Sequence, residues 1–190
     1  MGQATLAVGG NGCLQGVRRL ASPHHDRRPE GAAVELLVIH NISLPPGRYG
    51  GGAIERLFLG EPLAASSPFL ELLAGLRVSA HFVIDRTGSV TQFVSCDDRA
   101  WHAGISSFGG RDNCNDYSIG VELEGCDFTT FEPAQYAALA RLTRALLEAY
   151  PLQAVRGHSD IAAGRKTDPG PCFDWRRYAR LATLPEALLR

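Results

Sequence analysis

The hydrophobic positions of this chain form short runs that predict β-strands between turn-forming residues. Residues 34–40 are almost continuously apolar, which indicates a strand buried on both faces. Residues 117–124 alternate instead, with Ile, Val and Leu on one face and Ser, Gly and two Glu on the other. Residues 79–86 and 89–95 meet at an Asp-Arg-Thr-Gly turn, a pattern typical of a hairpin.

Helical spacing is clearest in residues 132–150. The apolar stripe of this segment consists of Leu139, Leu142, Leu146 and Ala149. Thr130 is the expected N-cap, Pro133 suits the first turn, and Pro151 ends the helix. We therefore expect one long helix after the last of these strands.

Shorter helices are expected at residues 53–60 and 174–181, and the Gly- and Pro-rich residues 41–52 predict a long loop. This order of elements predicts an α/β fold, a single domain with a central mixed β-sheet flanked by α-helices. Residues 1–20 are rich in Gly and Ala and only weakly periodic. We expect a leader segment there, followed by one domain over residues 21–190.

Composition and charge limit the partners. A chain of 190 residues is long enough for one domain with its own core. Its 19 basic and 20 acidic residues lack the basic surplus typical of nucleic-acid-binding proteins. No apolar run approaches the roughly 20 residues of a membrane span. We expect neither nucleic acid nor a membrane as partner.

Cysteine usage and the first residues bear on the cellular compartment. The five cysteines are odd in number and not closely paired, which indicates free thiols rather than a disulfide framework. The first residues lack the basic and long apolar regions of a secretory signal. Both observations predict the reducing cytoplasm.

Three residues form a candidate metal site. His40 ends the apolar run of residues 34–40, and His158 and Asp168 flank a short loop that Pro169 helps to stiffen. Two imidazoles and one carboxylate are enough protein ligands for a catalytic zinc whose fourth position is left to water. Zinc in such a site polarises a carbonyl and generates hydroxide near neutral pH. We predict one Zn²⁺ per chain and an amide hydrolase.

Candidate groups for proton transfer and charge stabilisation lie near these ligands. Lys166 stands two residues before Asp168, where a positive charge suits the stabilisation of an oxyanion. Glu122 and Glu124 share one face of the strand at residues 117–124, and one of them is the expected base. The alternation of the strand does not distinguish these two acids.

Other residues leave alternatives open. Cys172 is a rival ligand, since thiolate binds zinc well. His102 is a candidate fourth ligand. Trp101, directly before it, can stack on a sugar or close the edge of a core. His81 is expected in the middle of a strand, with a structural role.

Several collinear segments resemble a known family. These segments are residues 37–47 (LVIHNISLPPG), 78–82 (VSAHF), 99–104 (RAWHAG), 115–125 (NDYSIGVELEG), 157–158 (GH) and 165–170 (RKTDPG). Together they resemble the AmpD family of type 2 N-acetylmuramoyl-L-alanine amidases, which is related to phage lysozyme-type amidases and peptidoglycan recognition proteins. The resemblance runs from about residue 22 to residue 175, so it covers most of the chain.

The resemblance implies roles for the candidate residues. It implies that His40, His158 and Asp168 bind zinc. It also implies that Glu122, rather than Glu124, is the catalytic acid and base. Lys166 would then stabilise the oxyanion.

The same resemblance implies a set of substrate-binding residues. Asn41, Trp101 and His102 would line the anhydro-sugar side, and Arg77 would bind carboxylates of the stem peptide. Family members often carry an arginine where this chain has Asn113. The nearby Arg111 is therefore expected to make the peptide contact in its place.

The function implied is cleavage of the amide between the lactyl group of 1,6-anhydro-N-acetylmuramic acid and L-alanine, by a cytoplasmic monomer in peptidoglycan recycling. A link to β-lactamase induction is implied with it. The enzymatic alternative is a phage or autolytic amidase that acts on intact peptidoglycan. The non-enzymatic alternative is a peptidoglycan-binding module, which would typically lack a metal ligand, whereas all three ligands and Glu122 are present here.

Overall fold

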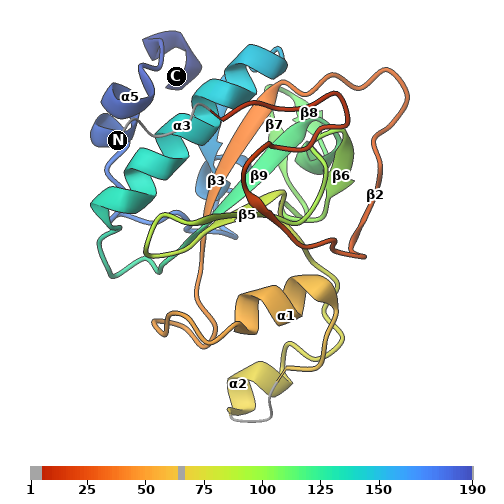
Figure 1. Cartoon of the computed structure of the whole chain (residues 1–190), viewed down its shortest axis with the longest axis vertical. Coiled ribbons are helices and arrows are strands. Elements are labelled where there is room, and N and C mark those ends of the chain that lie inside the picture. The colour runs from red at the N-terminus through yellow and green to blue at the C-terminus, as the bar shows by residue number, and fades with distance from the viewer. Residues whose placement is uncertain (1–5, 64–66, 190) are drawn as a thin grey trace.

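A mixed six-stranded sheet forms the centre of the computed structural model, which describes residues 6–63 and 67–189 (Figure 1). In sequence order its strands are β1 (Arg18–Arg19), β3 (Leu36–Ile42), β4 (Phe82–Ile84), β5 (Val90–Gln92), β9 (Ser118–Glu124) and β10 (Ala154–Gly157). They lie in the order β1-β5-β4-β9-β3-β10. All neighbours are parallel except β4 and β5, which confirms the expected mixed sheet.

The hairpin β4–β5 forms where it was expected, but its strands are shorter than residues 79–86 and 89–95. The Asp85 carboxylate closes the turn by accepting backbone N–H bonds from Thr87 and Ser89 at 2.8 and 2.9 Å. His81 lies just before β4 rather than in mid-strand. The strands β1 and β10 were not expected.

The long helix α3 (Pro133–Ala149) covers one face of the sheet together with α5 (Trp175–Ala182) (Figure 1). Leu139, Leu142 and Leu146 are buried as expected, but Ala149 is exposed because the buried stripe ends one turn earlier. The expected N-cap Thr130 is also wrong. The helix begins at Pro133, with Glu132 as the N-cap residue and the Gln135 side chain accepting its backbone N–H at 3.0 Å.

The helices α1 (Ala53–Leu59) and α2 (Pro68–Glu71) lie at the opposite end of the molecule from α5 (Figure 1). They pack on a second apolar cluster that includes Phe58, Leu70 and Phe93. No helix among residues 6–63 and 67–189 is long and apolar enough to cross a bilayer.

Two small antiparallel ladders and three short helical segments complete the fold. The ladders pair β2 (His25–Arg27) with β6 (Asp98–Ala100), and β7 (Ser107–Phe108) with β8 (Arg111–Asp112). The segments are η1 (Cys114–Asp116), α4 (His158–Ile161) and η2 (Glu186–Leu189). The last of these lies beside β10, where Arg156 donates a hydrogen bond of 2.8 Å to the Leu188 carbonyl.

Residues 6–20, expected as part of a leader segment, pack onto the domain. Leu14 is only 2 % exposed and belongs to the main core. Its backbone N–H donates to the Gln92 side chain at 2.8 Å. The strand β1 then extends the sheet beyond β5, and Arg18 forms an ion pair with Glu55 of α1. Residues 1–5 lie outside the described residues.

The Arg28 side chain links the loop that carries Cys96 to the segment of residues 115–118 before and at the start of β9. Its guanidinium donates to the backbone carbonyls of Cys96, Asn115, Asp116 and Ser118 at 2.8–3.2 Å. Burial lowers the pKa of Arg28. Carbonyl dipoles, rather than a carboxylate, therefore satisfy this charge.

Candidate metal centre and active site

The candidate site forms where three parallel strands end next to one another. In the register of β3 and β9, His40 lies directly opposite Glu122. The neighbouring β10 pairs Gly157 with Ile39, so His158 follows immediately after the strand at the same edge. Residues at the carboxyl ends of parallel strands meet in this way and open into a crevice.

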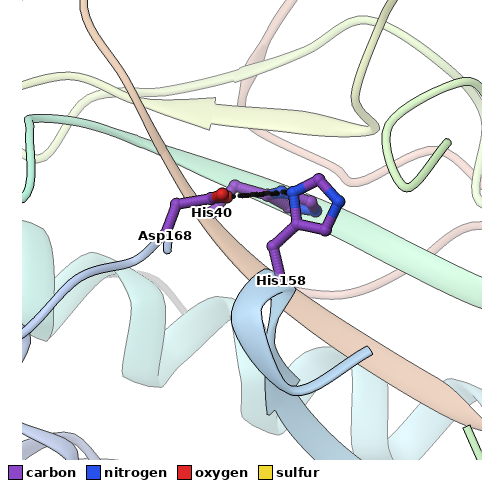
Figure 2. A group of neighbouring side chains, drawn as sticks. All are labelled: His40, His158 and Asp168. Atoms are coloured by element: carbon purple, nitrogen blue, oxygen red, sulfur yellow. Dashed lines mark hydrogen bonds and ion pairs between the residues drawn. The ribbon is translucent and has the colours of Figure 1, made fainter. Parts of the chain in front are cut away.

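Figure 2 shows His40, His158 and Asp168 converging from β3, the start of α4 and the loop after it. The two Nδ1 atoms are 3.0 Å apart. The Asp168 Oδ2 atom lies 3.0 Å from Nδ1 of His40 and 3.1 Å from Nδ1 of His158. These three residues form the group of the described chain that can hold a metal ion.

The geometry of the three donor atoms fits a small divalent cation. Ligand atoms about 2.0–2.1 Å from a tetrahedral zinc are separated from one another by roughly 3.3 Å, close to the spacing found here. Burial lowers the pKa of His40 to about 4, so its imidazole is neutral near pH 7. Burial acts to raise the pKa of Asp168, but hydrogen-bonding contacts with His158 and His40 hold it below its ordinary range. The site therefore offers a neutral imidazole at His40, a second imidazole at His158 and a carboxylate at Asp168.

The outer nitrogens of both imidazoles are held by protein groups. The Nε2 atom of His158 donates to the Ala103 carbonyl at 2.9 Å, so Nδ1 is the ring nitrogen that faces the other two donor atoms. The Nε2 atom of His40 lies 2.9 Å from Nδ1 of His102. His102 thus lies behind His40, not beside the three donor atoms, and the interpretation as a fourth ligand is wrong.

The two strand acids occupy different environments. Glu124 is already engaged, because its oxygens accept backbone N–H bonds from Gly50 and Arg86. Glu122 is buried, and its Oε2 has no hydrogen-bond partner within the described part of the chain. Burial and the nearby Asp168 charge raise the pKa of Glu122 well above its ordinary value. A buried acid with a raised pKa and a free oxygen has the properties of a group that takes up and releases a proton.

Comparison with known proteins identifies the family of this site. The sequence profile described as N-acetylmuramoyl-L-alanine amidase matches residues 30–171, which include the cluster of His40, His158 and Asp168. The chain belongs to the N-acetylmuramoyl-L-alanine amidase family. It is 52 % identical over 174 residues to the 1,6-anhydro-N-acetylmuramyl-L-alanine amidase AmpD of Escherichia coli, covering 90 % of this chain and 95 % of that protein.

Solved structures agree with this assignment. The fold matches the crystal structure of a selenomethionine AmpD derivative with a TM-score of 0.87 and 51 % identity, covering 90 % of this chain and 97 % of that one. It also matches AmpDh3 of Pseudomonas aeruginosa in complex with anhydromuramic pentapeptide, with a TM-score of 0.60 and 29 % identity. That alignment covers 82 % of this chain and 63 % of the AmpDh3 chain. The expected α/β amidase fold is confirmed.

Two further residues of this amidase stand next to the cluster in sequence. Lys166 is exposed, and its charge acts to lower the pKa of both His40 and Glu122. Cys172 is a half-buried free thiol and does not belong to the metal-binding group. Asp168, rather than Cys172, completes the group.

Asn41 and Trp101 lie close to the site but are already engaged. The Asn41 amide donates to Asp127 at 2.7 Å and to the Pro169 carbonyl at 3.0 Å, so it braces the loop that carries Asp168. The Trp101 indole N–H donates to Asp26 at 3.2 Å. Its ring stacks on His24 at 6.1 Å between centroids.

The two expected peptide-binding arginines are separated by the fold. Arg77 is exposed, with its guanidinium carbon 5.9 Å from the centre of the Trp101 ring. Arg111 instead pairs with Glu35 and lies over the Tyr117 ring. Because Glu35 precedes His40 by five residues of extended chain, this end of β3 is about 17 Å from the cluster. The structure therefore does not bring Arg111 to the site.

Sequence reasoning missed the supporting residues Ser118, Ala103 and Asn115. The Asn115 side-chain oxygen accepts backbone N–H bonds from His102 at 3.2 Å and from Ala103 at 2.8 Å. The residue lies within a segment that resembles the family, but no local pattern marks an asparagine as a brace for a distant loop.

Proposed function

We propose that this amidase is zinc-dependent and hydrolyses the amide between the lactyl group of 1,6-anhydro-N-acetylmuramic acid and L-alanine. The observation that carries the proposal is the buried His40–His158–Asp168 group with Glu122 opposite His40. The relatives named for the same reaction on anhydro sugars are about half identical to this chain over most of its length. A homologue also binds anhydromuramic pentapeptide.

His40, His158 and Asp168 would hold one Zn²⁺ per chain. Zinc in such a site acts as a Lewis acid toward a carbonyl oxygen and makes water acidic enough to attack near neutral pH. Glu122 takes the proton of the attacking water on its free carboxylate oxygen. As the carbon–nitrogen bond breaks, Glu122 returns this proton to the departing L-alanine amine. The hydroxyl of the water thus ends on the lactyl carboxyl group, and its proton ends on the L-alanine amine.

Lys166 would act on the charge that develops on the carbonyl oxygen. Its ammonium group is exposed next to Asp168, so it can reach a substrate at the cluster without being buried in the free protein. An interaction that strengthens as the oxyanion forms lowers the barrier rather than tightening substrate binding. We assign Lys166 this role.

Substrate recognition would involve three of the residues implied by the family. Trp101 offers apolar ring surface, because its indole N–H is already bonded to Asp26. Asn41 keeps its side-chain oxygen for a sugar group, since its amide hydrogens are bonded to Asp127 and Pro169. Arg77 is exposed near Trp101 and can reach a carboxylate of the stem peptide.

We further propose that the chain acts as a cytoplasmic monomer in peptidoglycan recycling, and so influences β-lactamase induction through the fragments that it consumes. The five free cysteines support a reducing compartment. The balance of acidic and basic residues supports a small-molecule substrate rather than nucleic acid.

Substrate comparison tests the proposal. An anhydro-muropeptide should be cleaved with a kcat/KM roughly 10–200-fold above that of the reducing muropeptide, because the extra hydroxyl is poorly paired against an apolar ring. A chelator should abolish turnover and added zinc should restore it. Equal kcat/KM values for the two muropeptides, or efficient release of peptides from intact sacculi, would instead favour a phage-type or autolytic amidase.

A further inference from the structure

Four of the six histidines form a continuous row behind and within the cluster. Ring centroids are 4.5 Å apart for His158 and His40, 5.0 Å for His40 and His102, and 5.7 Å for His102 and His81. Only the first two contribute atoms to the metal-binding group of the described chain. The function proposed above therefore leaves His102 and His81 without a role.

The hydrogen bonds of His102 form a directed chain. Its Nδ1 lies 2.9 Å from Nε2 of His40, and its Nε2 lies 3.2 Å from the Ser118 hydroxyl. If His40 keeps Nδ1 free for a metal, its single proton is on Nε2 and must be donated to an acceptor. His102 provides that acceptor at Nδ1 and donates its own Nε2–H to the Ser118 hydroxyl oxygen. Both ring nitrogens of His102 are then used inside the protein.

A glycine of the sheet leaves the space that the His102 ring occupies. Gly120 lies on β9 between Ser118 and Glu122, and a Cβ atom there would be 2.5 Å from Cγ of the His102 ring. The imidazole therefore packs directly on the strand backbone. Any side chain at residue 120 would displace the ring from His40.

One segment supports both candidate imidazole ligands. His102 contacts His40 through its ring, and the adjacent Ala103 carbonyl accepts the Nε2 proton of His158. The Asn115 side chain fixes the backbone of the two residues, and Arg165 donates to the Ala103 carbonyl at 2.7 Å. Movement of this segment would disturb both imidazoles together.

We propose that His102 is a positioning residue of the metal centre, which holds His40 in the tautomer and orientation that present Nδ1 to the cation. The inference rests on the proposed zinc site and gives His102 a role other than metal ligand or substrate contact. Outer groups that accept the second proton of a ligating histidine typically change metal affinity by about 10–100-fold when removed. We expect a loss of this size.

Two variants of similar size isolate the hydrogen bond. His102→Leu fills space but offers no acceptor, which leaves the His40 Nε2–H buried without a partner. His102→Asn places an amide oxygen near the position of Nδ1 and can accept that proton. Zinc affinity, measured on the full chain by competition with a chromogenic chelator, should fall about 10–100-fold in His102→Leu and by less than about tenfold in His102→Asn.

Substitution of cobalt for zinc provides a second measurement, a visible absorption spectrum, that does not depend on turnover. The visible absorption of the Co²⁺-substituted protein reports the ligand geometry, so it should change in His102→Leu and return toward the wild-type spectrum in His102→Asn. The control is His81→Gln. His81 is also a buried histidine, bonded to the Gly120 N–H and the Asp98 carbonyl, but it touches none of the three candidate ligands. This substitution should lower the melting temperature without changing zinc affinity or the cobalt spectrum.

The outcomes separate this inference from the proposed function. If the wild-type chain binds no zinc, the proposed metal site itself is wrong. If wild type binds zinc and His102→Leu binds it equally well with an unchanged cobalt spectrum, the positioning role is overturned. Equal losses in His102→Leu and His102→Asn would also overturn it, because the loss would then follow from the missing ring rather than from the acceptor.

Discussion

Replacing Glu122 by glutamine tests the proposed proton transfer with little change in shape. The carboxyl group is buried on β9 directly opposite His40, and its Oε2 has no partner within the described part of the chain. Glu122→Gln keeps the size of the side chain but removes the group that accepts and releases a proton. Because Glu122 is outside the metal-binding group, zinc should be retained.

The expected loss follows from the absence of a substitute base. General acid–base catalysis contributes about 10²–10⁴-fold, which corresponds to roughly 3–5 kcal/mol of transition-state stabilisation. Glu124 cannot take over, because its oxygens already accept N–H bonds from Gly50 and Arg86. We therefore expect the upper half of this range for Glu122→Gln.

The stability of the metal-free protein gives an independent measurement. Burial raises the pKa of Glu122 in the folded state well above 4.5, so the folded chain keeps a proton that the unfolded chain loses as the pH rises. The wild-type free energy of unfolding should therefore decrease as the pH rises above about 4.5 because of this group. Glu122→Gln removes that decrease, and its stability relative to wild type should increase from pH 4 to pH 8.

The assays are kcat/KM on an anhydro-muropeptide, zinc content, and urea unfolding in the presence of chelator. Glu124→Gln is the matched control, since it alters the same strand face two residues away. A Glu122→Gln variant that keeps zinc and more than about a tenth of the wild-type activity would refute the proton-transfer assignment. A difference in stability that does not vary with pH would refute the raised pKa.

Four other substitutions have clear expected outcomes. Asp168→Ala should release zinc in metal analysis while Cys172→Ser retains it, and the reverse result would exchange the third ligand. Lys166→Ala should lower kcat and kcat/KM together, whereas a rise in KM alone would indicate ground-state binding. Lys166 is the only lysine of the sequence, so acetylation should reproduce this loss and reductive methylation, which keeps the charge, should not. Arg28→Met should lower the free energy of unfolding by about 3 kcal/mol or more by leaving buried carbonyls unpaired, and an unchanged urea midpoint would contradict this.

The candidate ligands could be predicted because each has a local signature. His40 ends an apolar strand, and His158 and Asp168 bound a short proline-containing loop. The choice between Glu122 and Glu124 could not be made from alternation, because residues two apart on a strand share a face. Only contacts with Gly50 and Arg86, which are distant in sequence, show that Glu124 is already engaged.

Short elements and long-range contacts were the parts that the sequence did not predict. The four residues of β10 lie between Leu152 and His158 and carry too few apolar positions to be distinguished from a loop. The contact between His102 and His40 joins residues 62 positions apart, and nothing near His102 indicates it. Arg111 was expected at the site because it lies near Asn113, where family members often carry an arginine, but its ion pair with Glu35 holds it at the other end of β3.

The two edge strands of the sheet determine whether a strand of another molecule can pair with it. An unpaired strand edge is a template on which another chain can add a strand. Here β1 is two residues long and consists of arginines, and η2 lies beside β10 with the Leu188 carbonyl bonded to Arg156. Both edges therefore resist aggregation through strand addition. Deleting Glu186–Leu189 would uncover β10 and should make the protein aggregate on warming, even though the cluster of His40, His158 and Asp168 would keep all of its residues.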